Sequence, residues 1–172
     1  MSVTEKDMSG PFKCIEFVND KAVYKLKHED ISQFLNQDKV LAKKIANIKI
    51  KYELENNLKP TKAYESLEDK CQIAITTLKN TMTLKITPTR NFLYKFTVGL
   101  KMDKVAANEL FELCGGKLRD DCMADVICQH ALKSESNQGD NIHDFIAEFE
   151  KYTKSKIALR DRNPNKDTEK RL

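Results

Sequence analysis

Apolar residues recur every three or four positions between residues 60 and 82, and this is the strongest periodic signal in the chain. The stripe consists of Tyr64, Leu67, Cys71, Ile75, Leu78 and Met82. Side chains at this spacing share one face of an α-helix, whereas Glu68 and Lys79 fall off that face. We therefore predict a helix from Pro60 to about Met82, whose apolar face must be covered by other elements of the fold.

A helix–stop–helix unit occupies residues 102 to 134 and contains three of the five cysteines. Asp103 is placed to cap the first helix, because an aspartate side chain accepts hydrogen bonds from the free amides of a first turn. Gly115-Gly116 is expected to end that helix, since glycine adopts the left-handed conformation without a Cβ clash. Asp120-Asp121 stands where the N-cap of the second helix is predicted.

Two more helices are predicted outside these segments. Asp38 begins a long one over residues 39 to 57, in which apolar residues keep a three-to-four spacing. Residues 48 to 54 also alternate strictly between apolar and charged side chains, so a β-strand stays open as an alternative there. Asn141 is the predicted cap of the last helix. The buried face of that helix is expected to contain Ile142, Phe145, Ile146, Phe149 and Ile157.

Alternating apolar residues predict β-structure near the N-terminus. Residues 12 to 26 have the pattern of a two-stranded hairpin with a turn near Asn19-Asp20, and a short helix capped by Asp30 follows it. Residues 82 to 98 alternate in a similar way on both sides of a proline, which favours a second hairpin. A helix from Thr89 to Leu100 is an equally weighted alternative for that segment.

The composition favours a mainly α-helical fold in one domain. Five glycines and four prolines are few for a β-sandwich or barrel, and 172 residues suit a single domain. We expect a mobile leader over residues 1–9, the hairpin and short helix over 10–37, a helical bundle over 38–158 and a charged, disordered tail over 159–172.

The cysteines and the distribution of apolar residues limit the classes of protein to which this chain can belong. The five cysteines are Cys14, Cys71, Cys114, Cys122 and Cys128. Their odd number argues against a disulfide framework, and none forms the close pair typical of zinc sites, so they are interpreted as packing residues. No apolar run approaches the ~20 residues that cross a bilayer, and the N-terminus lacks the apolar core of a signal peptide. These features predict a soluble, cytoplasmic protein.

We identify no catalytic, cofactor-binding or metal-ligating residues. A P-loop needs Ser or Thr after its Gly-Lys pair, but Leu follows the pair Gly116-Lys117. Hydrolase, metalloprotease and dinucleotide motifs are not found, and His28, His130 and His143 are scattered. These absences favour a non-catalytic protein without a cofactor. Two alternatives stay open: a small enzyme or nucleotide-binding protein with a dispersed site, and a nucleic-acid accessory protein that uses the basic helix around Lys43-Lys44 and the charged tail.

Several short patterns occur in a fixed order along the chain. The first group comprises Gly10-Pro11, Cys14-Ile15, Asn19-Asp20, Tyr24-x-Leu26 and the helix with Ile31 and Leu35. The second comprises Ile48-Lys49-Ile50, Pro60 and Cys71-Gln72-Ile73-Ala74, and the third comprises Cys114-Gly115-Gly116 and residues 131–145. Together they resemble the atlastin and guanylate-binding-protein family of dynamin-like GTPases. The first group is similar to the segment before its GTPase core, and the others are similar to its helical middle domain.

The resemblance implies a remnant of that family. The family's GTPase core would lie between the first and second groups, but here Ala46 to Ile50 runs directly into the segment that resembles the middle domain. No catalytic residue can therefore be transferred. The resemblance implies an interaction module that docks a dynamin-like GTPase through a helical face, as a regulator or decoy at the periphery of the endoplasmic reticulum.

Overall fold

The computed structural model describes residues 14–18, 21–25 and 28–157, and most of this part is helical. The strands are β1 (Cys14–Val18) and β2 (Lys21–Lys25), and the helices are α1 (His28–Asn56), α2 (Pro60–Cys71), α3 (Ile75–Met82), α4 (Arg90–Gly99), α5 (Lys104–Phe111), α6 (Met123–Ala131) and α7 (Ile142–Thr153). This arrangement confirms the predicted mainly α-helical bundle. The predicted leader and the predicted tail lie outside the described residues.

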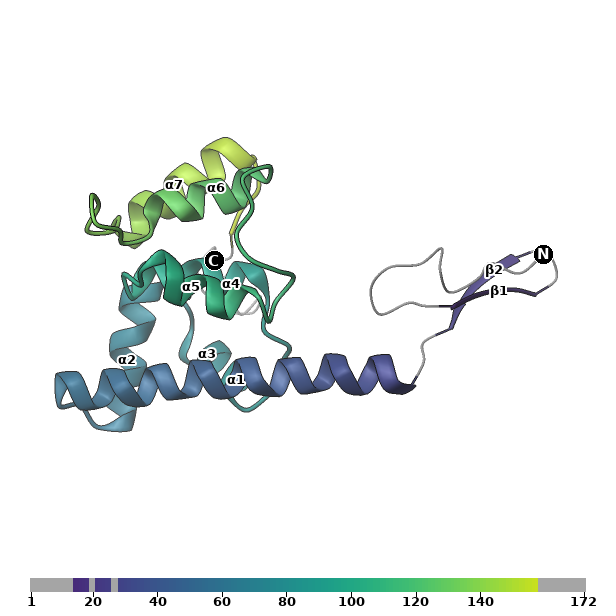
Figure 1. Cartoon of the computed structure of the whole chain (residues 1–172). Helices are drawn as coiled ribbons and strands as arrows, with labels where there is room; N and C mark the ends of the chain where they lie inside the picture. The colour runs from purple at the N-terminus through teal and green to yellow at the C-terminus, as the bar shows by residue number, and fades with distance from the viewer. Residues whose placement is uncertain (1–13, 19–20, 26–27, 158–172) are drawn as a thin grey trace, which may run out of the picture.

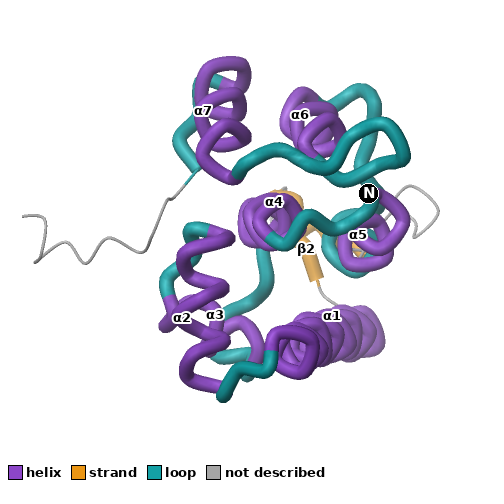
Figure 2. Tube along the Cα trace, turned by 90° about the vertical axis from the view of Figure 1, so that its left-hand side faces the viewer, coloured by secondary structure: helices purple, strands orange, loops and turns teal. Residues whose placement is uncertain are grey.

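Helix α4 is the centre of the bundle. The long helix α1 runs along one edge of the molecule, α6 and α7 cover the opposite edge, and α4 lies between them (Figure 1). Helices α2, α5, α6 and α7 all contact α4, and the view along α1 shows α4 surrounded by its neighbours (Figure 2). Every residue from Phe92 to Val98 is buried, including Lys95 and Thr97.

The prediction of a second hairpin over residues 82–98 is wrong, and the alternative helix is confirmed. Thr89 caps α4, because its side-chain oxygen accepts a hydrogen bond from Phe92 N at 3.1 Å. The alternation that suggested strands is a consequence of burial on all sides. A helix without a solvent-facing side has no regular polar positions, so its sequence does not show the helical period.

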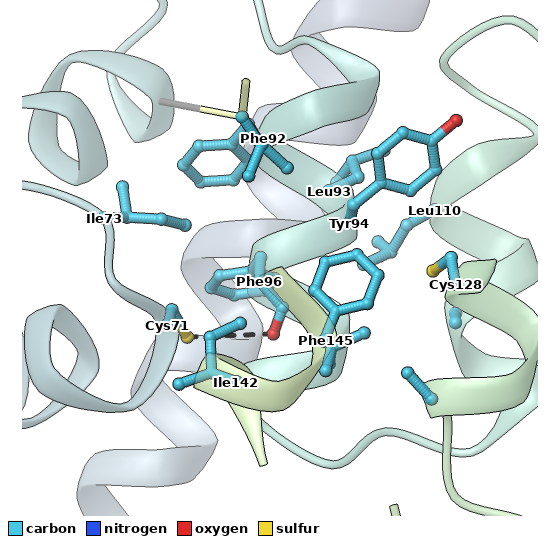
Figure 3. Close-up of a cluster of buried hydrophobic side chains, with 14 of the residues drawn as sticks. Cys71, Ile73, Phe92, Leu93, Tyr94, Phe96, Leu110, Cys128, Ile142 and Phe145 are labelled. Atoms are coloured by element: carbon cyan, nitrogen blue, oxygen red, sulfur yellow. Dashed lines mark hydrogen bonds between the residues drawn. The ribbon is translucent and has the colours of Figure 1, made fainter. Parts of the chain in front are cut away.

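The predicted helix from Pro60 to Met82 is divided into α2 and α3. Gln72 adopts a left-handed conformation with a φ of 55°, which ends α2. Buried Lys95 of α4 donates a hydrogen bond to Gln72 O at 3.1 Å, and Glu68 accepts one from Ile75 N at 3.0 Å. The break brings Ile73, which lies off the predicted stripe, into the core. In this core the thiol of Cys71 donates to Phe96 O at 3.8 Å, and a dashed line marks this bond in the close-up (Figure 3).

The short helix after the hairpin and the long helix from Asp38 are one continuous helix, α1. The predicted boundary between residues 37 and 38 therefore falls inside a helix, and the strand alternative for residues 48–54 is wrong. Neither glycine nor proline occurs between residues 28 and 56, so nothing in this segment interrupts helical hydrogen bonding. Leu41 and Ile45 are fully buried, as the helical spacing predicted.

The N-terminal hairpin is present in the predicted place. β1 and β2 pair antiparallel, with Ile15 opposite Tyr24 and Phe17 opposite Ala22. The predicted turn residues, Asn19-Asp20, lie outside the described residues.

Two helix-end predictions are confirmed and two are wrong. Asp103 caps α5 by accepting from Ala106 N at 2.8 Å, and Asn141 caps α7 by accepting from His143 N at 2.8 Å. Gly115-Gly116 adopts positive φ angles of 85° and 103°, but α5 already ends at Phe111, with Glu112 as its C-cap, so the predicted stop at the glycines is not where the helix ends. The N-cap of α6 is Cys122, not Asp120-Asp121.

Candidate functional site: a groove between α1 and α5

An open groove of about 410 Å³ runs between α1 and α5. The α1 wall is formed by Lys44, Asn47, Ile48, Lys51, Tyr52 and Glu55. The opposite side and the floor are formed by Leu100, Met102, Asp103, Ala106, Glu109 and Leu110. In the view along α1, this helix and α5 are seen on the same side of α4 (Figure 2). The groove is therefore the place where the helices around α4 leave an opening.

The turn between α4 and α5 positions the floor of the groove. Lys101 takes a positive φ of 52°, and Met102 N then donates to Thr97 O at 3.0 Å. Met102 O accepts a hydrogen bond from Lys133 N at 3.0 Å, which ties this turn to the end of α6. The Asp103 cap starts α5 directly after the turn. The apolar floor is consequently held by backbone hydrogen bonds on both sides.

The α1 wall is fixed from behind by α2. The hydroxyl of Tyr52 hydrogen-bonds to Ser66 of α2, and the ammonium of Lys70 lies 5.2 Å from the Tyr52 ring centroid. Tyr52 and Ile48 are partly buried and pack against the core. An aromatic ring held by a hydrogen bond and a cation loses little rotamer freedom when another group packs on it. This wall is therefore preorganised for contact.

The two rims of the groove carry opposite charges. Lys44, Lys51 and Glu55 lie on the α1 side, which keeps an excess of one positive charge, and Asp103 and Glu109 lie on the α5 side. Lys51 also pairs with Glu55 at 3.8 Å, but both side chains are largely exposed, so water screens this pair and it holds Lys51 weakly. A ligand with a charged flank on each side would meet both rims.

A second, shallower hollow follows the outer side of α5. It shares Asp103, Ala106 and Glu109 with the groove and adds Val105, which is 74% exposed. Helix α5 thus offers contact surface on two sides. The exposed residues of α5 follow no recognisable motif, so the sequence does not indicate this contact surface.

A cluster around buried Asp125 is the strongest alternative site. Arg90 Nη2 lies 2.9 and 2.8 Å from the two carboxylate oxygens of Asp125, and Tyr94 donates its hydroxyl hydrogen to the same carboxylate. Arg90 Nη1 donates to Cys114 O at 2.6 Å and to Gly116 O at 2.7 Å. These bonds connect α4, α6 and the glycine turn, and we call this set of residues the Arg90 clasp.

The Arg90 clasp has the properties of a structural element. Arg119 N donates to Asp125 at 3.0 Å, so this carboxylate accepts hydrogen bonds from three residues. Burial alone would raise the pKa of Asp125, but the hydrogen bonds from Tyr94 and Arg90 outweigh it and lower that pKa. The carboxylate is thus ionised at neutral pH, and its oxygens already accept hydrogen bonds from protein groups. An ionised carboxylate cannot act as a general acid, and one that is engaged in this way cannot reach a substrate as a general base. Neither hollow along α5 includes Arg90 or Asp125.

Cys71, Cys114 and Cys128 are not activated nucleophiles. Burial raises the pKa of Cys71 and of Cys128 to about 12, and burial also raises the pKa of the Cys114 thiol. Thiols with such pKa values are protonated at neutral pH and react slowly. Cys71 and Cys128 are buried in the core, as predicted for packing residues, whereas Cys114 and Cys122 are partly exposed.

The remaining polar candidates from the sequence stay apart. His130 is exposed at the end of α6, and His143 is exposed in the first turn of α7. Among the residues that the structure describes, no group of three or more histidine, cysteine, aspartate or glutamate side chains is arranged to hold a metal ion. Asp121 pairs with Arg119 at 2.6 Å on the surface.

Comparisons with protein-family models, with curated proteins and with solved structures found no match to this chain. Over the described helices, none has both the length and the apolar character that a bilayer-spanning segment requires. The geometry of the groove and of the Arg90 clasp is accordingly the basis on which a function is proposed.

Proposed function

We propose that this protein is a non-catalytic interaction module that binds an amphipathic helix of another protein in the groove between α1 and α5. The observation that carries the proposal is the combination of an apolar floor with rims of opposite charge. Helix-in-groove recognition uses this combination, because the apolar face of the bound helix provides affinity and the charged flanks fix its orientation.

The length of the groove defines the length of the bound segment. The α1 wall extends from Lys44 to Glu55. At a rise of about 1.5 Å per residue, this wall is about 17 Å long, which corresponds to about three helical turns. A bound helix would therefore place about three or four apolar residues on the floor, at positions i, i+3 or i+4, i+7 and i+11.

The charges of the rims define the flanks of the bound helix. Lys44 and Lys51 favour acidic residues on the flank that faces α1, and Asp103 and Glu109 favour basic residues on the flank that faces α5. A helix that carries acidic residues on one flank and basic residues on the other would form favourable charge contacts with both rims. This pattern distinguishes the expected partner from a nucleic acid, which offers only negative charge.

Site-specific crosslinking tests the proposal. A photo-crosslinking amino acid is introduced at Ala106 in the groove or, as a control, at exposed Ala147 on α7. After illumination in cell lysate, the peptides attached to each position are identified by mass spectrometry. We expect the label at position 106 to capture a segment with the apolar and charge pattern described above, and the label at position 147 not to capture it. Equal capture at both positions, or captured segments without this pattern, would refute the proposal.

The resemblance to the atlastin and guanylate-binding-protein family adds a specific partner to this proposal. A dynamin-like GTPase at the endoplasmic reticulum would supply the bound helix, and the module would act as its regulator or decoy. The same crosslinking experiment tests the identity of the partner separately from the position of the binding site. Capture of a patterned helix from an unrelated protein would reject the GTPase as partner and keep the groove as the binding site.

A further inference from the structure

The two ends of the α1 wall of the groove differ in charge. Lys44 lies at the end nearer to the N-terminus of α1, whereas Lys51 and Glu55 lie toward the other end and pair with each other at 3.8 Å. The opposite charges of that pair largely cancel, so the Lys44 end is the more positive one. Helix α1 ends at Asn56, and its last turn contains no basic residue. The negative end of the helix dipole therefore adds to the Glu55 end of the wall.

These charges favour one direction for a helix that lies in the groove. Every α-helix carries a partial positive charge at its N-terminus and a partial negative charge at its C-terminus. The N-terminus is favoured near Glu55 and the C-terminus is favoured near Lys44, so the preferred helix runs antiparallel to α1. Asp103 and Glu109 on the opposite rim have the same charge. They select the basic flank of the bound helix but do not distinguish its two directions.

The position of the groove beside α1 is seen in the view along that helix. Figure 2 views α1 from its C-terminal end, with α2 to its left and α5 to its upper right. Lys49 lies on the α2 side, 4.0 Å from the Tyr64 ring centroid, whereas Ile48 and Lys51 line the groove on the α5 side. A bound helix antiparallel to α1 therefore runs away from the viewer. Its apolar face points left toward the floor, with α5 above it and α1 below it (Figure 2).

The hand of the α-helix converts this direction into a sequence pattern. Consecutive residues of a right-handed helix that runs away from the viewer advance clockwise by about 100°. If apolar residues at i, i+4, i+7 and i+11 face the floor on the left, then i+1 and i+8 point up toward α5, and i+3 and i+10 point down toward α1. The acidic rim of α5 favours basic residues at i+1 and i+8, and the basic rim of α1 favours acidic residues at i+3 and i+10. In a helix that runs parallel to α1, the two sets of positions exchange places.

We propose that the groove selects its partner helix by direction and binds it antiparallel to α1, with basic residues at i+1 and i+8 and acidic residues at i+3 and i+10. This inference rests on the proposed function and adds to it the order of charges along the bound segment. A segment with the two charge types exchanged matches both rims only when it runs parallel to α1, and its dipole then opposes the charges at both ends of the wall. The order of charges therefore distinguishes partner helices that have the same composition.

Two synthetic peptides of equal composition test the direction. Both have about 21 residues, acetylated and amidated termini and leucine at the apolar positions. The first has lysine at i+1 and i+8 and glutamate at i+3 and i+10, and the second has lysine and glutamate exchanged. In titrations of the full-length protein, we expect the first to bind at least about threefold more tightly, because only this peptide matches the rims and the wall ends in one orientation. This preference should decrease in Lys44→Gln and persist in Lys85→Gln, which removes an exposed charge away from the groove.

Nuclear magnetic resonance of the complex reads the direction of the bound peptide. A nitroxide label on the N-terminal residue of the first peptide should broaden the amide signals of residues 53–56 more than those of residues 42–45. The reverse broadening, equal affinities of the two peptides or tighter binding of the second would overturn the proposed direction and leave the groove as a binding site. Binding of neither peptide would overturn both this inference and the proposed function.

Discussion

Asp125 is a nearly fully buried carboxylate whose hydrogen bonds come from Arg90, Tyr94 and the backbone of Arg119. Replacing Arg90 with methionine would remove the cation and leave the carboxylate buried without its charge partner. Removal of one partner from a buried ion pair typically destabilises a protein by about 3–5 kcal/mol. We expect a loss of this size for Arg90→Met in urea unfolding. Arg119→Met is the matched control, because among the described residues the side chain of Arg119 pairs with exposed Asp121, and this variant should unfold like the wild type.

The same carboxylate predicts how stability depends on pH. The pKa of Asp125 is lowered in the folded protein, since the hydrogen bonds from Tyr94 and Arg90 outweigh the effect of burial. A group with a lowered folded-state pKa contributes stability above its unfolded-state pKa of about 3.9 and loses this contribution as the pH falls through the folded-state pKa. We expect the free energy of unfolding to decrease more steeply below about pH 5 in the wild type than in Asp125→Asn. Parallel pH profiles would contradict this role of Asp125.

Residues that act locally could be predicted from the sequence, whereas residues that act across the fold could not. Asp103 and Asn141 were identified as caps because a cap needs only its own first turn. The partners of Asp125 come from α4 and from the loop before α6, so no local pattern predicts them. Its position among apolar residues in α6 was the available signal, since a charge inside an apolar segment requires a partner.

At the scale of elements, the packing of α2 against α4 depends on Gly99. A Cβ atom at this position would lie 2.6 Å from both Cys71 Cα and Lys70 O. Helix propensity alone predicts that Gly99→Ala stabilises the protein by about 0.5–1 kcal/mol. We expect the opposite sign, a loss of about 1–3 kcal/mol, because backbone atoms of α2 must move. Asn91→Ala, at an exposed position of α4, is the control for the effect of helix propensity alone. Thermal unfolding measures the stability of both variants and of the wild type.

The bounds of the elements show where sequence periodicity fails. The predicted helix ends at Gln72. The break allows the side chain of Ile73 to be buried and Gln72 O to accept a hydrogen bond from Lys95, and both interactions are tertiary. The sequence of α4 shows no helical periodicity of apolar residues, because this helix is buried on all sides. In contrast, the helical spacing around Leu41 and Ile45 was interpreted correctly, since one face of that part of α1 stays in water.

At the scale of the whole molecule, the groove depends on how α1 and α5 are placed around α4. Lys44 and Glu109 are far apart in the sequence, and each looks like an ordinary surface residue in its own helix. The sequence therefore predicted an interaction module with a helical face but not the location of that face. The folded chain supplies the missing information, because it places a basic rim and an acidic rim on the two sides of one apolar floor.

The charged rims predict a salt-dependent contribution to binding. Lys51→Glu would repel the acidic flank of the bound helix, so we expect weaker binding of the captured segment at low ionic strength. The difference from the wild type should shrink as salt increases, because exposed charges are screened beyond about 10 Å at 0.1 M salt. Lys85→Glu changes the net charge equally at an exposed position away from the groove and should bind like the wild type. Equal weakening by both variants would indicate a general charge effect.

The most direct test of the central claim is to fill the groove. Ala106→Trp would place an indole on the floor, and Ala147→Trp would place the same group on the exposed surface of α7. Isothermal titration of a synthetic peptide of the captured helix measures the affinity of each variant. We expect Ala106→Trp to bind at least about tenfold more weakly than the wild type, a loss of about 1.4 kcal/mol, and Ala147→Trp to bind equally well. An unchanged affinity of a folded Ala106→Trp variant would contradict binding in the groove.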